Sequence, residues 1–167
     1  MIKVAFFDLN CYNMVNQLKM EEVMEFFAKE FSQLTTCELY EILKSRAQIF
    51  LLEQNIVCQD LDDVDYESLH CFFSDGKRVI AYLRAYMSDK EKKTVTVGRV
   101  LSLEHKKGMG STLMKKSIDE IKKHFDCEKI SVHAQKQAMG FYEKMGFCAV
   151  SDEFLEEGIV HVMMERI

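Results

Sequence analysis

The clearest pattern of apolar and polar positions lies between residues 35 and 53. Thr35 is followed three residues later by Glu38, which is the spacing of a helix-capping box. Apolar residues then recur every three to four positions, which predicts an amphipathic helix with one buried face; they are Leu39, Ile42, Leu43, Ala47, Phe50 and Leu51. We expect this helix to end near Glu53, and the acidic segment QNIVCQDLDDVDYES after it to be a loop.

Two weaker patterns precede this helix. Residues 2–7, IKVAFF, form a short β-like run. The stretch from there to about Phe31 carries apolar residues at roughly helical spacing, namely Met14, Leu18, Val23, Phe26 and Phe27.

From Leu69 onward the apolar period changes to two. The segments LHCFF and RVIAYLRAYM flank the turn SDGK, in which Asp75-Gly76 supplies the backbone freedom of a tight turn, so they predict a β-hairpin. After the polar break SDKEKK, the segment TVTVGRVLSL is rich in β-branched residues and predicts another strand.

The rest of the chain alternates between helical and strand patterns. Residues 108–125 carry an apolar stripe with lysines opposite, which predicts an amphipathic helix packed on a sheet; the stripe is Met109, Leu113, Met114, Ile118, Ile121 and Phe125. The strand EKISVHA, a helix over QKQAMGFYEKM, and the strands FCAVSD and IVHVMME follow. The order is helix, three strands, helix, strand, helix, two strands, which predicts an α/β fold around a central sheet.

Composition narrows the class of protein. With 167 residues, 48% of them hydrophobic and 29% charged, the chain is expected to form a globular domain, and it contains no proline for a proline-rich linker. A net charge of −5 disfavours a dedicated nucleic-acid binder. The apolar runs are too short for a membrane-spanning helix, and the N-terminus is a poor signal peptide, so we expect a cytoplasmic protein.

The six cysteines point to neither a metal site nor a disulfide framework. They are spread along the chain without a CxxC pair or clustered histidines, so we expect reduced thiols and no bound metal.

One segment carries candidate chemistry. Gly108 and Gly110 lie between the strand 94–103 and the helix that follows, where backbone amides and the helix dipole favour a phosphate. Lys106 and Lys107 would add positive charge. A Walker loop is excluded because the pattern GxxxxGK[ST] is absent.

Two segments together resemble the GNAT superfamily of acetyl-CoA-dependent N-acetyltransferases. The loop His105–Gly110 matches the pattern Q/R-x-x-G-x-G/A except at its first position, and AQKQAMGFYEKMGF is similar to the signature A-x-x-FY-x-x-x-GF. The ElaA-like branch is closer still, because RAQIFLLEQN, QDLDD, VIAYLRA, VGRV, AQ and EEGIVHVMM resemble its landmarks in order. The resemblance covers residues 24–167, which leaves 1–23 as an N-terminal extension of a single domain.

The resemblance implies a fold, a donor and a set of residues. The fold would be a mixed sheet flanked by helices, splayed between the strands before and after the phosphate-loop helix. Tyr142 would be the general acid that protonates the leaving thiolate, although packing alone would also explain a tyrosine there. Backbone donors at a bulge near Val100 would polarise the thioester. The residues implied to bind acetyl-CoA are Val100, Leu101, Ser102, His105, Lys106, Lys107, Gly108, Met109, Gly110, Ser111, Thr112, Gln135, Phe141 and Lys144.

The general base and the acceptor stay open at this stage. Glu53, at the end of the first helix, is the first candidate for the base, but a solvated helix-end charge or a water chain fits equally well. Arg46, Arg84 and Arg99 would suit an anionic acceptor, or would simply pair with the acids of QDLDDVD.

Two functions of different classes follow from these observations. The first is an N-acetyltransferase acting on a small-molecule or peptide amine, with no nucleic-acid or membrane partner. The second is a non-catalytic domain that binds acetyl-CoA or other proteins on the same fold. Many relatives pair, so a homodimer is compatible with either.

Overall fold

The computed structural model describes residues 24–104 and 108–167, which form one seven-stranded sheet flanked by helices. The strand order is β1-β2-β3-β4-β5-β7-β6, and every neighbouring pair is antiparallel except β4 and β5. The strands are β1 Glu25–Glu30, β2 Leu69–Ser74, β3 Val79–Asp89, β4 Thr94–Ser102, β5 Lys129–Gln135, β6 Cys148–Glu156 and β7 Ile159–Arg166.

The α-helices are α2 Thr36–Arg46, α3 Met109–His124 and α4 Met139–Lys144. A π-helix, η2 Ala47–Glu53, continues α2, and short 3-10 helices cover η1 Phe31–Gln33, η3 Val64–Glu67 and η4 Lys136–Ala138. The element order predicted from Thr35 onward is therefore confirmed. The predicted β-like run at residues 2–7 lies outside the described residues.

Local signals in the sequence act as predicted at two boundaries. The Thr35 hydroxyl accepts a hydrogen bond from the Glu38 amide at 3.2 Å, and the Glu38 carboxylate accepts one from the Thr35 amide at 2.9 Å. These reciprocal bonds are the capping box that starts α2. In the β2–β3 turn, Gly76 has a φ of +85°, and the Asp75 carboxylate accepts bonds from the amides of Lys77 and Arg78.

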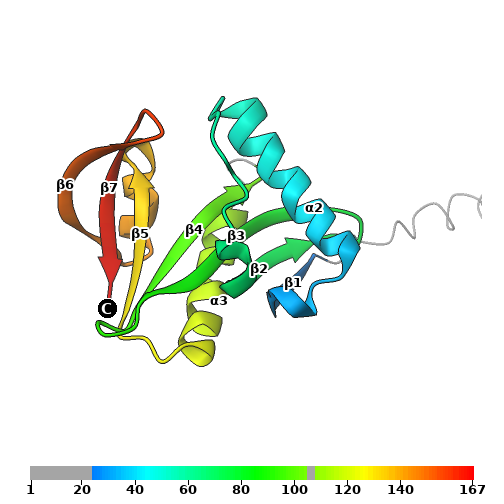
Figure 1. The fold of residues 1–167 in the computed structure, drawn as a ribbon, viewed down its shortest axis with the longest axis horizontal. Helices are drawn as coiled ribbons and strands as arrows, with labels where there is room; N and C mark the ends of the chain where they lie inside the picture. Colours follow the sequence, from blue (N-terminus) through cyan, green and yellow to red (C-terminus); the bar gives the residue numbers. More distant parts are fainter. Residues whose placement is uncertain (1–23, 105–107) are drawn as a thin grey trace, which may run out of the picture.

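The two longer α-helices cover opposite faces of the sheet (Figure 1). Leu69, Cys71 and Phe73 of β2 belong to the core that contains α3, whereas Phe72 between them belongs to the core that contains α2. Since successive strand residues point to opposite faces, this alternation fixes the two layers. The predicted stripe of α3 is confirmed, with Leu113, Met114, Ile118 and Ile121 buried and its two end residues, Met109 and Phe125, partly buried.

The predicted core face of the first helix is partly wrong. The helix extends to Glu53 as expected, but Ala47 and Leu51 are exposed, while Ser45 and Arg46 are buried. The Ser45 hydroxyl donates to the Val79 carbonyl at 2.7 Å, and Arg46 pairs with acidic residues. Because these polar groups find partners in the interior, an apolar stripe cannot reveal the buried face.

The predicted helical spacing before Phe31 is also wrong within the described residues. Residues 25–30 form β1, an edge strand antiparallel to β2. Phe26 packs against Phe73 and Phe27 stacks on Phe72, with ring centroids 5.3 and 5.2 Å apart. The two phenylalanines thus point to opposite faces of the sheet, as successive residues of a strand do. Met14, Leu18 and Val23 lie outside the described residues.

The sheet splays apart between β4 and β5, as expected for the fold class. Their parallel pairing runs from Thr94 and Lys129 to Val97 and Val132 and then stops, although both strands continue. Figure 1 shows β5, β7 and β6 diverging from β1–β4 on this side. Beyond Val97, the backbone groups of β4 that face β5 have no partner in that strand, so they can bind another molecule.

Candidate active site

A cleft of about 680 Å³ follows the splay between β4 and β5. On its β5 side it is lined by Ser131, Val132, His133 and Gln135; Val132 and Ala134, which alternate with the three polar residues, also belong to the core that contains α3. The cleft therefore lies on the face of the sheet away from α3. Its walls also include residues of η2, the loop after it, and the β6–β7 hairpin.

A β-bulge interrupts β4 at the edge of this cleft. Tyr82 and Arg84 of β3 pair with Leu101 and Gly98 of β4, so the one residue between them on β3 opposes both Arg99 and Val100. Arg99 has a φ of +55°, which turns the strand locally. The structure therefore contains a bulge where the family resemblance implies one, and Val100, within it, lines the cleft.

Tyr142 lies on the α4 side of the same cleft. Tyr142 is only 6% exposed, and its ring packs edge-on against the rings of Phe141 and Phe147, with centroids 5.0 and 5.8 Å away. Burial raises the pKa of the Tyr142 phenol, so the hydroxyl stays protonated at neutral pH. The Tyr142 side chain thus packs in the core and also lines the cleft.

The start of α3 meets the signature segment of α4. Gly108 is the N-cap residue with a φ of +77°, and it has no side chain to cap the first amides of the helix. A Cβ on Gly110 would lie 3.8 Å from the Phe141 ring, so the two segments that carry the resemblance are neighbours in space. The first amides of this 16-residue helix, which the N-cap residue cannot cap with a side chain, are a suitable anion site.

The remaining predicted site residues lie in several places. Leu101 is buried in the core under α2, and the Ser102 hydroxyl donates to the Glu104 carbonyl. Lys144 is exposed on α4, and the Thr112 hydroxyl donates to the Gly108 carbonyl. Met109 and Ser111 belong to the first turn of α3. His105, Lys106 and Lys107 lie outside the described residues.

Glu53 is separated from Tyr142 by a bridge of two glutamines. It lines a second hollow, of about 620 Å³, beside the main cleft. Gln135 donates a hydrogen bond of 3.1 Å to Gln54, and both residues line the two hollows. The Gln54–Gln135 bridge therefore marks the boundary between them.

Three arginines and three aspartates form a closed ring of ion pairs on the wall of the cleft. Each carboxylate pairs with two guanidinium groups, and the N···O distances between neighbours run from 2.6 to 3.2 Å. All three aspartates come from QDLDDVD, so the pairing alternative for the arginines is confirmed. In order, the ring is Arg46, Asp60, Arg99, Asp62, Arg84 and Asp65.

The ion pairs of the ring shift the pKa values of Arg84 and Asp62. Burial alone would lower the pKa of the Arg84 guanidinium, but hydrogen bonds to Asp62 and Asp65 raise it above its usual value. The pKa of Asp62 is lowered, chiefly by the hydrogen bond from Arg84. Both shifts favour the ionised forms of Arg84 and Asp62, and the ion pairs fasten the loop 56–68 to β3 and β4.

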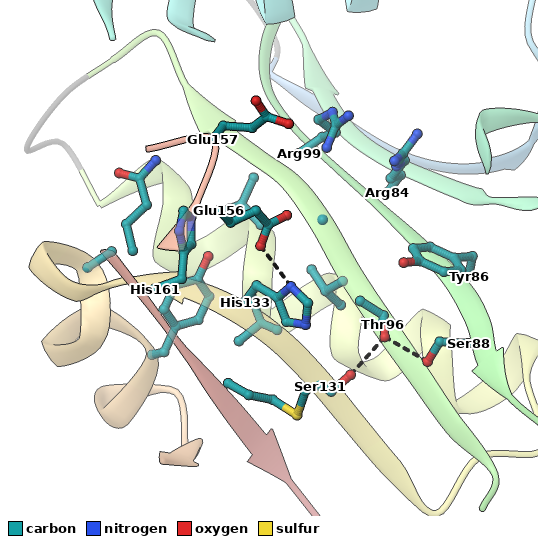
Figure 2. A pocket seen from close by; sticks show the side chains of 18 of the residues that line it. Arg84, Tyr86, Ser88, Thr96, Arg99, Ser131, His133, Glu156, Glu157 and His161 are labelled. Carbon is teal, nitrogen blue, oxygen red and sulfur yellow. Dashed lines mark hydrogen bonds and ion pairs between the residues drawn. The ribbon is translucent and has the colours of Figure 1, made fainter. Parts of the chain in front are cut away.

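Sequence reasoning missed a histidine–carboxylate pair in the cleft. His133 of β5 donates from Nδ1 to the Glu156 carboxylate at 2.9 Å, and both side chains are half-exposed (Figure 2). His161 lies nearby on β7. The available signal was the alternation of polar Ser131, His133 and Gln135 along β5, but nothing in the sequence links His133 to a residue on β6.

Hydroxyl groups continue the polar floor beyond this pair. Thr96 donates to Ser88 at 2.7 Å and is bonded to Ser131 at 2.8 Å, which makes a row across β3, β4 and β5 (Figure 2). This row gives the side of the cleft opposite α3 a polar, uncharged surface for a ligand.

Two features are absent from the described residues. Among residues 24–104 and 108–167, no helix is long and apolar enough to cross a membrane. The same ranges hold no group of three His, Cys, Asp or Glu side chains placed to bind a metal ion.

Comparisons with known proteins agree with this geometry. The chain is 32% identical over 139 residues to the protein ElaA of Escherichia coli, covering 81% of this chain and 91% of ElaA. The crystal structure of Escherichia coli ElaA matches with a TM-score of 0.80 and 29% identity, covering 87% of this chain and 100% of that one. An acyl-CoA N-acyltransferase from Pseudomonas aeruginosa matches with a TM-score of 0.78 and 28% identity, over 86% and 99% of the two chains.

A family model gives the same result over most of the sequence. The model of the acetyltransferase (GNAT) domain matches residues 19–167, which include the splayed strands, helix α3 and the cleft. This chain therefore belongs to the GNAT family of acetyltransferases.

Proposed function

We propose that this protein transfers an acetyl group from acetyl-CoA to a primary amine by direct attack. The observation that carries the proposal is the cleft at the splay, which brings the β4 bulge at Val100 and the buried phenol of Tyr142 to one cavity. The family and the acyl-CoA N-acyltransferase of similar structure support an acyl-CoA donor.

The donor would lie between the two arms of the sheet. The first amides of α3 suit the pyrophosphate of coenzyme A, and the unpaired backbone of β4 beyond Val97 suits the amide groups and thioester of its acyl arm. Amides at the bulge would then stabilise the negative charge that develops on the thioester oxygen.

Tyr142 would protonate the departing thiolate. Because burial raises its pKa, the phenol carries its proton at neutral pH and can donate it when the C–S bond breaks. Glu53, the base considered from the sequence, would act through water, because it lines the second hollow and not the main cleft.

The acceptor would be a neutral or cationic amine, either small or at a peptide terminus or side chain. The three arginines that would suit an anionic acceptor already pair with the aspartates of the ring, and together the six groups carry no net charge. The hydroxyl groups of Ser88, Thr96 and Ser131 would form hydrogen bonds with such a molecule.

The test is release of coenzyme A thiol with a panel of amines. We would screen spermidine, glucosamine, tyramine and a lysine-containing peptide, each with acetyl-CoA and the full chain. Turnover with one of them is expected, and Tyr142→Phe should lower its kcat about 100-fold because the variant lacks the acidic proton.

Calorimetry with acetyl-CoA separates binding from chemistry. The Tyr142→Phe variant should bind acetyl-CoA with an affinity close to that of the wild type, because the ring and its packing are kept. Binding without turnover of any amine would favour the non-catalytic alternative, and an unchanged kcat in the variant would exclude Tyr142 as the acid.

A further inference from the structure

We infer that His133, oriented by Glu156, is the general base that takes the proton from the attacking amine. This inference rests on the proposed acetyl transfer and adds a residue to the acceptor side of that site. His133 is the first residue of β5 beyond the last pair with β4, Val97 and Val132, so it lies where the two strands separate. Its neighbours Val132 and Ala134 belong to the core, which places His133 on the cleft face.

The hydrogen bond to Glu156 fixes the state of the imidazole ring. A carboxylate only accepts, so the bond of 2.9 Å requires the proton on Nδ1 and leaves the lone pair on Nε2. A carboxylate on one ring nitrogen also stabilises the cation that forms when the other nitrogen takes up a proton. The pair therefore has the arrangement of an oriented base.

The surroundings hold this pair in place. The ring of Phe154 packs edge-on against His133 with centroids 5.2 Å apart. Glu156 is the last residue before the two-residue turn Glu157-Gly158, and both turn residues have positive φ, at 49° and 77°. Such turns are tight and match the twist of the strands, so they fix the position of Glu156.

Three other proton acceptors that line the cleft, Asp60, Asp62 and His161, are less suitable. The carboxylates of Asp60 and Asp62 each accept bonds from two arginines of the ring. His161 donates from Nδ1 to the Ile159 carbonyl at 2.9 Å and is only 9% exposed, so a proton on it would be less accessible and would lack a carboxylate partner.

The proton and electron pairs balance in the proposed step. The amine nitrogen forms a bond to the thioester carbon as the C–S bond breaks, and the sulfur takes the proton of Tyr142. The extra proton on the nitrogen passes to Nε2 of His133, and Glu156 balances the imidazolium charge. Solvent then restores both side chains.

This role predicts a loss of activity on the acid side, because a protonated imidazole cannot accept a proton. The charged and titratable groups that face His133 influence how activity depends on pH. They are Glu156 on β6, Glu157 in the turn, His161 and Glu165 on β7, and Arg99 across the cleft on β4.

The kinetic test uses the full chain and the amine of the panel with the highest turnover. His133→Gln should lower kcat/KM about 100-fold and abolish the acid limb of its pH profile. Glu156→Gln should keep part of the activity, because a side-chain amide oxygen can still accept from Nδ1 but no longer balances the charge of the imidazolium. His124→Gln, at the far end of α3, is the matched control and should match the wild type.

A spectroscopic test needs no acceptor. In the protein labelled with ¹⁵N-histidine, the signal that disappears in His133→Gln should show the tautomer protonated on Nδ1 at a pH above the limb. The tautomer protonated on Nε2 would overturn the inference, as would wild-type kcat/KM in His133→Gln. If His161→Gln instead removed the acid limb, the base would be His161.

The two proposals fail in different ways. Absence of turnover in the wild type with every amine would contradict acetyl transfer itself, and the role of His133 would fall with it. Normal turnover in the wild type together with an unaffected His133→Gln variant would contradict only the role of His133. Unchanged calorimetric affinity for acetyl-CoA in His133→Gln is expected in either case, since His133 lies on the acceptor side.

Discussion

Substitution of Asp65 by asparagine tests whether the ring of ion pairs holds the fold together. Asp65 receives hydrogen bonds from Arg46 Nη1 at 2.8 and 2.9 Å and from Arg84 Nη1 at 2.9 Å. The Arg46 side chain is fully buried and that of Arg84 is 4% exposed. An asparagine keeps the size of the side chain but removes its charge and directs an amide donor toward guanidinium donors.

The magnitude follows from the charge that remains. Without the Asp65 carboxylate, three arginines share two aspartates, so one buried positive charge is uncompensated. Removing one partner of a buried ion pair costs about 3–5 kcal/mol of folding free energy. For a domain of this size that corresponds to a fall of about 6–20 °C in Tm. Urea unfolding followed by circular dichroism measures the free energy directly.

Asp63→Asn is the matched control. It removes the same charge two residues away, at an exposed position with a φ of +64° that asparagine tolerates well. Its effect should stay within about 0.5 kcal/mol. If Asp65→Asn changed stability by no more than this control, the ring would not be compensating buried charge, and the reasoning would be refuted.

Three further outcomes are expected. Gly146→Ala should cost about 2–3 kcal/mol, because its φ of +85° is strained for alanine and its Cβ, 2.8 Å from Arg166 Nη1, would push that group off the Met145 carbonyl to which it donates. Gly76→Ala, at the same φ in open space, should cost about 1 kcal/mol, and equal losses in urea unfolding would contradict the contribution of Arg166. The hydrogen bond from Arg84 lowers the pKa of Asp62 below its usual 3.8, so the stability that Asp62 contributes is complete well above pH 3.8 and is lost as the pH falls through the lowered pKa. The difference in unfolding free energy between wild type and Asp62→Asn should therefore be smaller at about pH 3 than at about pH 6. Burial raises the pKa of Cys71 to about 12, so iodoacetamide at neutral pH should leave it unlabelled by peptide mass spectrometry while it labels the exposed Cys37, Cys58 and Cys148.

The parts of the fold that depend on local chemistry could be predicted from the sequence. The Thr35–Glu38 capping box, the Asp75-Gly76 turn and the stripe of α3 each act within a few residues, and all three are present in the structure. The strand β1 was missed because its conformation depends on pairing with β2, about forty-five residues away. The pairing of Arg46 with the acids of QDLDDVD was one of the predicted alternatives, but the apolar stripe did not place Arg46 on the buried face of α2, since only the distant aspartates make its burial tolerable.

In the candidate site, too, residues within one sequence motif could be predicted and residues that meet only in the folded chain could not. Tyr142 and the glycines at 108 and 110 belong to contiguous motifs, so the resemblance alone was enough to single them out. His133 and Glu156 are 23 residues apart and meet only because β5 and β6 both flank β7. No periodicity along one strand carries that information, so the pair emerged only from the three-dimensional arrangement.

The Gln54–Gln135 bridge has a consequence for how molecules reach the cleft. It joins Gln54, at the end of η2, to Gln135 at the tip of β5, and therefore connects the helical layer that packs on β3 and β4 to the other arm of the sheet, at the end opposite the pairing of β4 with β5. An exposed hydrogen bond between neutral side chains contributes about 1 kcal/mol, which is little more than thermal energy. Rotation of these two amide side chains, which also breaks the bond from Gln137 to Gln135, is therefore expected to join the two hollows without any strand having to move.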